Sequence, residues 1–414
     1  MVIPSVAASA GLENLGTSMK VLWESTGFAQ SGAEGLPFWG ANYVMLVISF
    51  VLFYLAIGRG FEPLLLVPIA FGMMLANVPG AYEELNKAPE YEIAGDVTSD
   101  LVASGGLFYY LSKGVEWVIF PPLIFLAIGA MTDFGPLIAN PKSLIMGAGA
   151  QLGIFVTLFA GYFIFGNNAQ LASAVAIIGG ADGPTAIYVA TQMGEAGEGG
   201  HLAAISIAAY SYMALIPAIQ PPIMKLLTTK KERCIRMKQM RAVSKREKII
   251  FPIVVVVLCG LFLPSALPLI GMLMLGNLLK ESGVTGRLAD TASNGLCNVV
   301  TILLGTCVGF KATASIFLQL ETLEIIGLGL AAFAFGTAGG VLIAKFMNLF
   351  LKDKINPLIG SAGVSAVPMA ARVSQKVGQK YVPDNYLLMH AMGPNVAGVI
   401  GSAVAAGILI AFFK

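Results

Sequence analysis

The sequence predicts an all-α polytopic membrane protein. Of its 414 residues, 57% are hydrophobic and only 12% are charged, with a mean hydropathy of +0.80. A soluble globular protein usually carries about twice that charged fraction. Uncharged runs of about 20 residues or more are long enough to cross a bilayer, and they recur at 202–224, 325–344 and 391–413. The net charge of +2 gives no indication of a nucleic-acid partner.

The first half of the chain leads from an amphipathic segment into several apolar spans. Residues 1–40 mix polar and apolar positions at rough helical spacing, which predicts an interfacial helix before the first span. A first membrane unit is expected over 41–224, and an acidic loop at 81–116 interrupts it. Its spans are expected near 41–57, 61–79, 117–131, 143–166, 169–192 and 202–224.

The segment 225–248, which we call the basic segment, carries the strongest topological signal. It holds ten Lys and Arg residues against Glu232 and Glu247. The positive-inside rule predicts that it is a cytoplasmic loop; a docking surface for an acidic partner or lipid is the alternative. A second membrane unit is expected over 249–414. Its spans lie near 249–264, 266–280, 294–311, 323–349 and 385–413, with a Gly/Ala/Ser/Pro stretch at 356–372.

Similar blocks in the two halves indicate two structural repeats. The paired blocks are 68–77 with 268–277, 129–147 with 309–327, and 177–184 with 358–365. They occur in the same order at nearly constant offsets, although chance similarity among Gly/Leu-rich helices is the alternative. Transporter repeats often have inverted topology, which brings two broken segments to the middle of the membrane. Here those segments would be 177–191 and 356–372.

Asp182 is the central candidate of the sequence. It is the only charged residue between Lys142 and Glu195, and Gly183 and Pro184 follow it directly. A carboxylate at membrane depth costs about 2.5–3.5 kcal/mol on insertion scales, so such a residue indicates a functional site. Gly and Pro interrupt the helix, which lipid tolerates only where protein or water satisfies the freed backbone groups.

The two broken segments and the last span offer oxygen ligands for a cation. Asp182 supplies a carboxylate, Thr185 and Ser365 supply hydroxyls, and Asn356 and Asn395 supply amide oxygens. Hard oxygens suit Na⁺ better than a transition metal, and a proton on the carboxylate competes with the ion. Alternatively, the two Asn residues cap interrupted helices, and Ser365 only permits close helix packing.

Other polar residues leave two interpretations open. Tyr212 either lines the ion path or is an interfacial aromatic residue. Arg372 either binds an anionic group with its guanidinium fork or extends to the cytoplasmic interface. Asp133 fits a site and a surface position equally well, whereas His201 and His390 are expected to be structural.

The run Gly179-Gly-Ala-Asp-Gly-Pro-Thr185 resembles the signature of the β subunit of the sodium-translocating decarboxylases. That family serves oxaloacetate, methylmalonyl-CoA, glutaconyl-CoA and malonate decarboxylase complexes. The resemblance extends from about residue 45 to the C-terminus. The other stretches that carry it are 61–68, 129–137 and 211–217.

The resemblance implies a subunit of a biotin-dependent complex in the bacterial cytoplasmic (inner) membrane. Such a subunit decarboxylates carboxybiotin, takes up a proton and exports Na⁺. The implied partners are a biotin-carrying carboxyltransferase subunit and a small membrane subunit. The family is described as an elevator-like homotrimer, in which the part that carries the broken segments moves against a scaffold.

The resemblance also assigns roles to residues. The implied Na⁺ ligands are Asp182, Asn356, Ser365 and Asn395. The positions implicated in coupling are Tyr212, Gly360 and Arg372, and we expect Arg372 to steady the carboxylate of carboxybiotin.

A stand-alone transporter is the main rival hypothesis. An elevator-type Na⁺-coupled carrier or antiporter without chemistry would have the same repeats, broken segments and intramembrane Asp. Only the family motifs favour the decarboxylase.

Overall fold

The computed structural model describes residues 17–24, 26, 29, 40–94, 97–197 and 199–414. In this part of the chain, five helical stretches are long and apolar enough to cross a membrane, or seven if each of two bent helix pairs counts as one span. The five are Ala41–Gly58, Ser143–Ile164, Gly286–Phe310, Leu320–Phe350 and Leu388–Phe413, and the bent pairs are Leu107–Glu116 with Phe120–Met131 and Leu202–Met213 with Leu215–Leu227.

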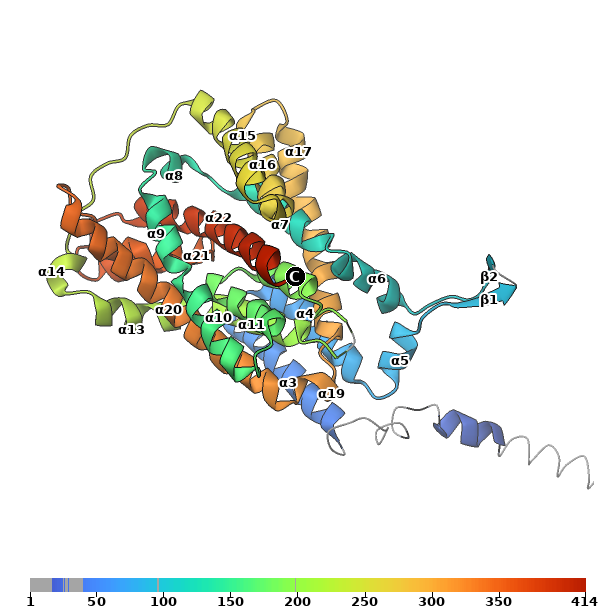
Figure 1. Cartoon of the computed structure of the whole chain (residues 1–414). Helices are drawn as coiled ribbons and strands as arrows, with labels where there is room; N and C mark the ends of the chain where they lie inside the picture. The colour runs from blue at the N-terminus through green and yellow to red at the C-terminus, as the bar shows by residue number, and fades with distance from the viewer. Residues whose placement is uncertain (1–16, 25, 27–28, 30–39, 95–96, 198) are drawn as a thin grey trace, which may run out of the picture.

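Helices make up nearly all of the regular structure (Figure 1). The first half contains α3 (Ala41–Phe53), α4 (Pro63–Asn77), α5 (Ala81–Asn86), α6 (Leu107–Glu116), α7 (Phe120–Met131), α8 (Gly135–Ala139), α9 (Ser143–Ala150), α10 (Leu152–Ile164), α11 (Ala169–Ala176), α12 (Gly183–Gln192), α13 (Leu202–Leu227) and α14 (Lys230–Arg233). The second half contains α15 (Lys245–Phe262), α16 (Leu267–Glu281), α17 (Gly286–Thr291), α18 (Cys297–Phe310), α19 (Ala314–Phe317), α20 (Leu320–Phe350), α21 (Met369–Gln379) and α22 (Leu388–Phe413).

The segment predicted as an acidic loop at 81–116 contains regular secondary structure. It contains α5, α6 and a two-stranded antiparallel hairpin of β1 (Glu90–Ala94) and β2 (Val97–Ala103). Short runs with β-branched residues favour strands, so the all-α prediction needs this one correction. The hairpin projects from the end of the molecule opposite α14 (Figure 1).

Part of the predicted N-terminal helix is present, and its interfacial position stays a prediction. Residues 17–24 are helical, and the apolar side chains of Met19, Leu22 and Trp23 are exposed. Residues 1–16, which the prediction also includes, lie outside the described residues.

Two helix pairs join the halves of the chain at very close range. A Cβ added to Gly309 of α18 would lie 2.0 Å from the carbonyl oxygen of Ile69 in α4, and one added to Gly129 of α7 would lie 1.9 Å from that of Leu273 in α16. Buried Asn side chains fasten both pairs. The Nδ2 of Asn77 donates to the carbonyl of Ala312 at 2.7 Å, and that of Asn277 donates to Thr132 at 3.4 Å.

Both segments predicted to be broken are interrupted helices. The first passes from α11 through a short 3₁₀ turn, η2 (Ile177–Gly180), and Ala181 then adopts a left-handed conformation with φ of 54° before α12 begins. The second runs through the 3₁₀ helix η5 (Pro357–Gly363), and α21 begins only at Met369. At these two breaks the chain leaves the α-helical conformation inside the helical body.

Glycines let η5 lie directly against its neighbours. A Cβ on Gly360 would lie 2.2 Å from the carbonyl oxygen of Gly340 in α20, and a Cβ on Gly340 would lie 2.1 Å from that of Gly360. On the other side, a Cβ on Gly398 of α22 would lie 2.1 Å from the carbonyl oxygen of Gly363. The second broken segment is therefore held between two long helices by backbone contacts.

We expect Gly360→Ala to destabilise the protein by about 1–3 kcal/mol, because the added methyl group overlaps backbone that cannot move freely. Thermal unfolding in detergent measures the loss. Gly327→Ala on α20 is the control, since nothing lies within 4 Å of its added Cβ. Equal losses in the two variants would contradict the close crossing.

Candidate functional site

Asp182 lies at the N-terminal end of α12, where the first broken segment resumes its helix. Its side chain is buried, with 5% of the residue exposed. The Oδ2 atom accepts hydrogen bonds from Thr185 Oγ1 at 2.7 Å and from Ser402 Oγ at 2.9 Å, and Oδ1 accepts a long bond of 3.4 Å from the backbone N of Thr185. Asp182 therefore caps a helix, a role that the sequence did not predict for it.

The Asp182 carboxylate has no counter-charge in the described part of the chain. None of the ion pairs there includes it. The positive end of α12 and two hydroxyls offer only partial compensation. A buried charge without a partner costs several kcal/mol, so this arrangement favours a monovalent cation or a proton beside the carboxylate.

The second broken segment meets the first beside Asp182. The backbone N of Ser365 donates to the carbonyl of Gly180 at 2.9 Å. From α22, Asn395 Nδ2 donates to the carbonyls of Ala362 and Val364 at 2.9 and 2.7 Å. Ser365 Oγ and Asn395 Oδ1 are buried and have no hydrogen-bond partner in the described residues. Two unpaired oxygens thus lie where the segments cross.

The alternative that Asn395 caps an interrupted helix is wrong. Helix α22 continues without a break through Pro394, and the Asn395 amide satisfies carbonyls of the other segment. This side chain therefore holds the crossing together while it leaves its oxygen free.

Asn356 lies apart from this crossing, at the basic segment. Its Oδ1 accepts from the backbone N of Leu358 at 3.1 Å, which caps η5 as the alternative expected. Its Nδ2 donates to the carbonyls of Arg233 and Ile235, both at 2.9 Å. All of its amide groups are engaged, and its role as an ion ligand stays a prediction.

Arg233 fixes the basic segment to the helical body. Its guanidinium donates to Thr228 Oγ1 at 2.8 Å and to the Tyr381 hydroxyl at 2.6 Å, and lies 5.0 Å from the Tyr381 ring centroid. It also donates to the carbonyls of Lys225 and Thr228. Nothing in the sequence distinguished this Arg from its basic neighbours.

Tyr212 and Arg372 occupy different surroundings. The Tyr212 hydroxyl donates to the carbonyl of Ile326 in α20. A Cβ added to Gly329 would lie 2.9 Å from the Tyr212 ring and 3.2 Å from Ile178 of η2, so the ring and Ile178 both lie against Gly329. Tyr212 thus lies beside the first broken segment without a hydrogen bond to Asp182. The Arg372 side chain is exposed on α21.

Ser402 is a site residue that the sequence analysis missed. It lies seven residues after Asn395 on α22, a spacing that places both on one helix face. Asn395 bonds to the second broken segment and Ser402 bonds to Asp182 in the first. The i, i+7 spacing was the available signal.

Asp133 and His201 both lie in ion pairs. Asp133 accepts a hydrogen bond from the Gly135 backbone N at 2.9 Å and pairs with Lys248 at 3.2 Å. These contacts favour the surface position over a site for Asp133. Partial burial raises the pKa of Asp133, but the hydrogen bonds from Gly135 and Lys248 outweigh it and hold this pKa below its usual value. His201 lies between Glu195 and Glu321, at 3.1 and 2.9 Å, and its hydrogen bond with Glu195 raises the pKa of the imidazole.

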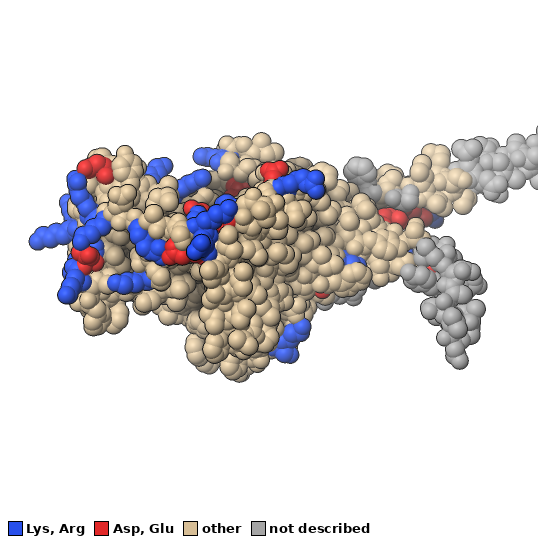
Figure 2. Space-filling model, turned by 90° about the horizontal axis from the view of Figure 1, so that it is seen from above, with Lys and Arg blue, Asp and Glu red and all other residues tan. Residues whose placement is uncertain are grey.

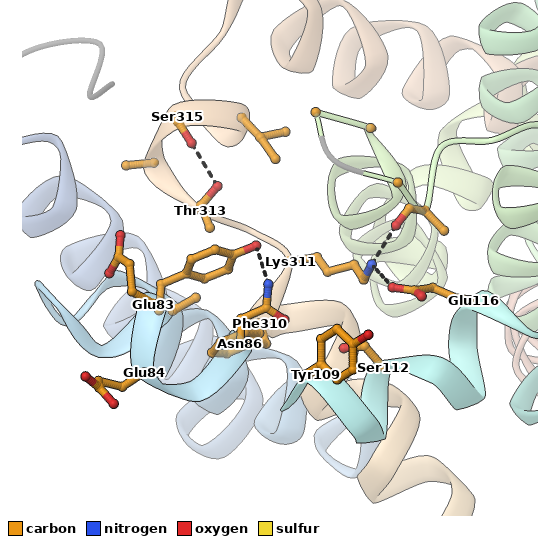
Figure 3. A pocket seen from close by; sticks show the side chains of 18 of the residues that line it. Glu83, Glu84, Asn86, Tyr109, Ser112, Glu116, Phe310, Lys311, Thr313 and Ser315 are labelled. Atoms are coloured by element: carbon orange, nitrogen blue, oxygen red, sulfur yellow. Dashed lines mark hydrogen bonds and ion pairs between the residues drawn. The ribbon is translucent and has the colours of Figure 1, made fainter. Parts of the chain in front are cut away.

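A cavity of about 940 Å³ opens at the end of the molecule that carries the hairpin. It is lined by α5, α6, the turn after α18 and the glycine-rich loop that follows α12. Lys311 reaches across it to Glu116 at 3.0 Å and to the carbonyl of Ala196 (Figure 3). The ten residues of α12 span about 15 Å, so this helix links Asp182 to the cavity.

With this geometry in place, comparison with known proteins identifies the family. The model of the Na⁺-transporting oxaloacetate decarboxylase beta subunit matches residues 41–413. The chain belongs to this family. The resemblance seen in its motifs is confirmed, and the chain is a multi-pass membrane subunit of a decarboxylase enzyme.

Curated relatives cover nearly the whole chain. The methylmalonyl-CoA decarboxylase subunit beta of Propionigenium modestum is 58% identical over 386 residues, which is 91% of this chain and 96% of the relative. The glutaconyl-CoA decarboxylase subunit beta of Acidaminococcus fermentans is 57% identical, over 90% of this chain and 93% of its own length. The oxaloacetate decarboxylase beta chain of Klebsiella pneumoniae is 51% identical, with 91% and 96% covered.

We expect Asn356→Asp to loosen the basic segment, because a carboxylate oxygen would face the two carbonyls that Nδ2 now satisfies. Trypsin should cut within 225–248 faster than in the unmodified protein. Asn385→Asp is the matched variant, since Asn385 Nδ2 donates to the same Ile235 carbonyl at 2.8 Å. A change in Na⁺ dependence without faster cleavage would instead support Asn356 as an ion ligand.

Proposed function

We propose that this chain is the membrane subunit of a biotin-dependent decarboxylase that pumps Na⁺. It decarboxylates carboxybiotin carried by a partner subunit, and it couples this reaction to Na⁺ export with proton uptake. The observation that carries the proposal is the buried Asp182 carboxylate, which has no counter-charge at the crossing of two broken segments. Membership of the Na⁺-transporting decarboxylase family supports it.

In this proposal the ion binds at the crossing. Asp182 supplies the negative charge, and Ser365 and Asn395 supply the two oxygens that lack partners. Thr185 and Ser402 now donate to the carboxylate, and rotation of their hydroxyls would present lone pairs to an ion instead. One carboxylate with neutral oxygens suits a monovalent cation. Na⁺ and H⁺ exclude each other at Asp182, which links ion binding to proton binding.

The chemical step takes place toward the basic segment. Lys and Arg side chains gather at that end, at the left of Figure 2, as the positive-inside rule requires of a cytoplasmic face. The exposed Arg372 guanidinium can hold the carboxylate of carboxybiotin. When CO₂ leaves, the N–C bond breaks, its electron pair stays on the ureido nitrogen, and that nitrogen takes up a proton. Asp182 is suited to pass the proton inward, and Tyr212 lies beside its segment.

The release route follows α12 to the opposite end of the molecule. The loop after α12 lines the cavity that Glu83, Glu84 and Glu116 also face. Glu116 is paired with Lys113 and Lys311, so Glu83 and Glu84 are the carboxylates that would attract a cation at this mouth. Na⁺ leaves by this cavity.

We also propose that 41–224 and 249–414 are inverted repeats. The matched contacts support this, because Asn77 and Asn277 occupy equivalent positions in the aligned blocks and bond to Ala312 and Thr132, which are equivalent as well. The four helices of these pairs form the scaffold, and the unit that carries the broken segments moves against it in an elevator-like homotrimer. Gly360 lies in the unit that carries the broken segments, in close backbone contact with Gly340 of α20.

The partners follow from the same proposal. A biotin-carrying carboxyltransferase subunit delivers carboxybiotin to the basic segment, and a small membrane subunit joins the complex. The acyl substrate binds to another polypeptide.

Asp182→Asn should reduce Na⁺-dependent decarboxylation and ²²Na⁺ uptake into inverted vesicles by about a hundredfold or more. The variant removes the carboxylate that balances the charge of the bound Na⁺, and loss of a charge partner at a buried site costs about 3–5 kcal/mol. Asp133→Asn is the control, because that carboxylate pairs with Lys248 at the surface. If the Asp182 variant keeps Na⁺-dependent decarboxylation of carboxybiotin, the assignment of Asp182 is wrong.

Copurification separates the pump from a stand-alone carrier. The affinity-tagged chain, extracted from its native membrane in mild detergent, should bring down a biotinylated protein that streptavidin detects. A carrier would bring down none, yet would still take up ²²Na⁺ without any decarboxylation substrate.

A further inference from the structure

Gln151 is a buried polar residue that the proposed mechanism does not yet use. It lies at the break between α9 and α10, with 5% of the residue exposed. Its Nε2 donates to the carbonyls of Gly147 and Gly398 at 3.2 and 3.3 Å. Its Oε1 has no hydrogen-bond partner within the described part of the chain. The two ends of this amide therefore have different surroundings.

An unpaired buried carbonyl oxygen costs about 1–3 kcal/mol and calls for an explanation. The hydrogen bonds of Nε2 account for one end of the amide and leave Oε1 unexplained. A neutral amide oxygen is a hard ligand of the kind that binds alkali cations beside a carboxylate.

The free oxygen of Gln151 faces the Asp182 segment. It lies 3.7 Å from the position of a Cβ built on Gly180, and Ser402 Cβ lies 3.2 Å from the same point. Ser402 in turn bonds to Asp182, and the Gly180 carbonyl accepts from the backbone N of Ser365. Gln151 Oε1 is thus placed among the residues that surround the crossing.

The contacts of helix α22 also place Gln151 beside the crossing. Asn395, Gly398 and Ser402 follow one another at spacings of three and four residues, so they form one face of the helix. Asn395 bonds to the second broken segment, Ser402 bonds to Asp182, and Gly398 between them accepts from Gln151. Gln151 therefore lies between the two groups of proposed ligands.

We propose that Gln151 supplies, through Oε1, a neutral oxygen ligand to the cation that Asp182 binds. This inference rests on the proposed function and adds a ligand from a third element, the α9–α10 break. Nε2 fixes the amide to α22, and this fixes the direction of Oε1. The side chain sets the affinity of the site for Na⁺.

The test compares Gln151→Met, which keeps the length but removes the amide, with Gln151→Glu, which keeps an oxygen. Thr157→Val is the control, because Thr157 is buried on α10 six residues further along. The purified complex is assayed for half-saturating Na⁺ and for the decarboxylation rate at saturating Na⁺. The purified chain is unfolded thermally in NaCl, with choline chloride at equal ionic strength as reference.

For Gln151→Met we expect half-saturating Na⁺ to rise about tenfold or more, as for loss of one ligand to a charge, with the rate at saturating Na⁺ retained. Stabilisation by NaCl should need correspondingly higher concentrations. Gln151→Glu should keep Na⁺ binding and make it depend more steeply on pH, because a second carboxylate can take up a proton. Thr157→Val should leave half-saturating Na⁺ unchanged.

A purely structural role would give a different pattern. Both Gln151 variants would then unfold at lower temperature without Na⁺, and half-saturating Na⁺ would stay unchanged, which would overturn the proposal. If Asp182→Asn abolishes the Na⁺-specific stabilisation while Gln151→Met leaves its concentration dependence intact, only the role of Gln151 fails. If the unmodified chain shows no Na⁺-specific stabilisation, the proposed function and the role of Gln151 both fail.

Discussion

The structure depends on one unbalanced charge, the Asp182 carboxylate. It is buried at a helix terminus, it accepts hydrogen bonds from two hydroxyls, and no cationic side chain in the described residues pairs with it. Hydrogen bonds orient a carboxylate but do not neutralise it. In the proposed function, the interrupted segments, the glycine contacts that bring them together and the unpaired oxygens of Ser365 and Asn395 surround the ion that neutralises this charge.

Sequence reasoning found the elements whose signal is a local anomaly. Asp182 stood out because it is the one charge in a long apolar run. The breaks were visible because Gly183 and Pro184 follow Asp182 and because the stretch 356–372 is rich in Gly and Pro, which helices tolerate poorly. The meeting of the two segments could be inferred because the repeated blocks place them at equivalent positions. Their direct contact through Gly180 and Ser365 agrees with that inference.

What sequence reasoning missed depends on contacts between distant parts of the chain. Ser402 and Gln151 look like ordinary small or polar residues of apolar helices, and only the packing of α22 against both segments gives them a place. The sequence could not place Asn356 because capping and ion ligation use the same amide group. The β1–β2 hairpin was missed because its acidic residues resembled a loop.

The anchoring of the basic segment has a mechanical consequence. Asn356 ties the Arg233 and Ile235 carbonyls to the start of η5, and Arg233 is itself clamped to Tyr381. These contacts couple the basic segment to the start of η5, so a displacement of one is transmitted to the other. In the proposed function, a partner that docks at the basic segment would thereby act on the backbone that leads to the crossing beside Asp182.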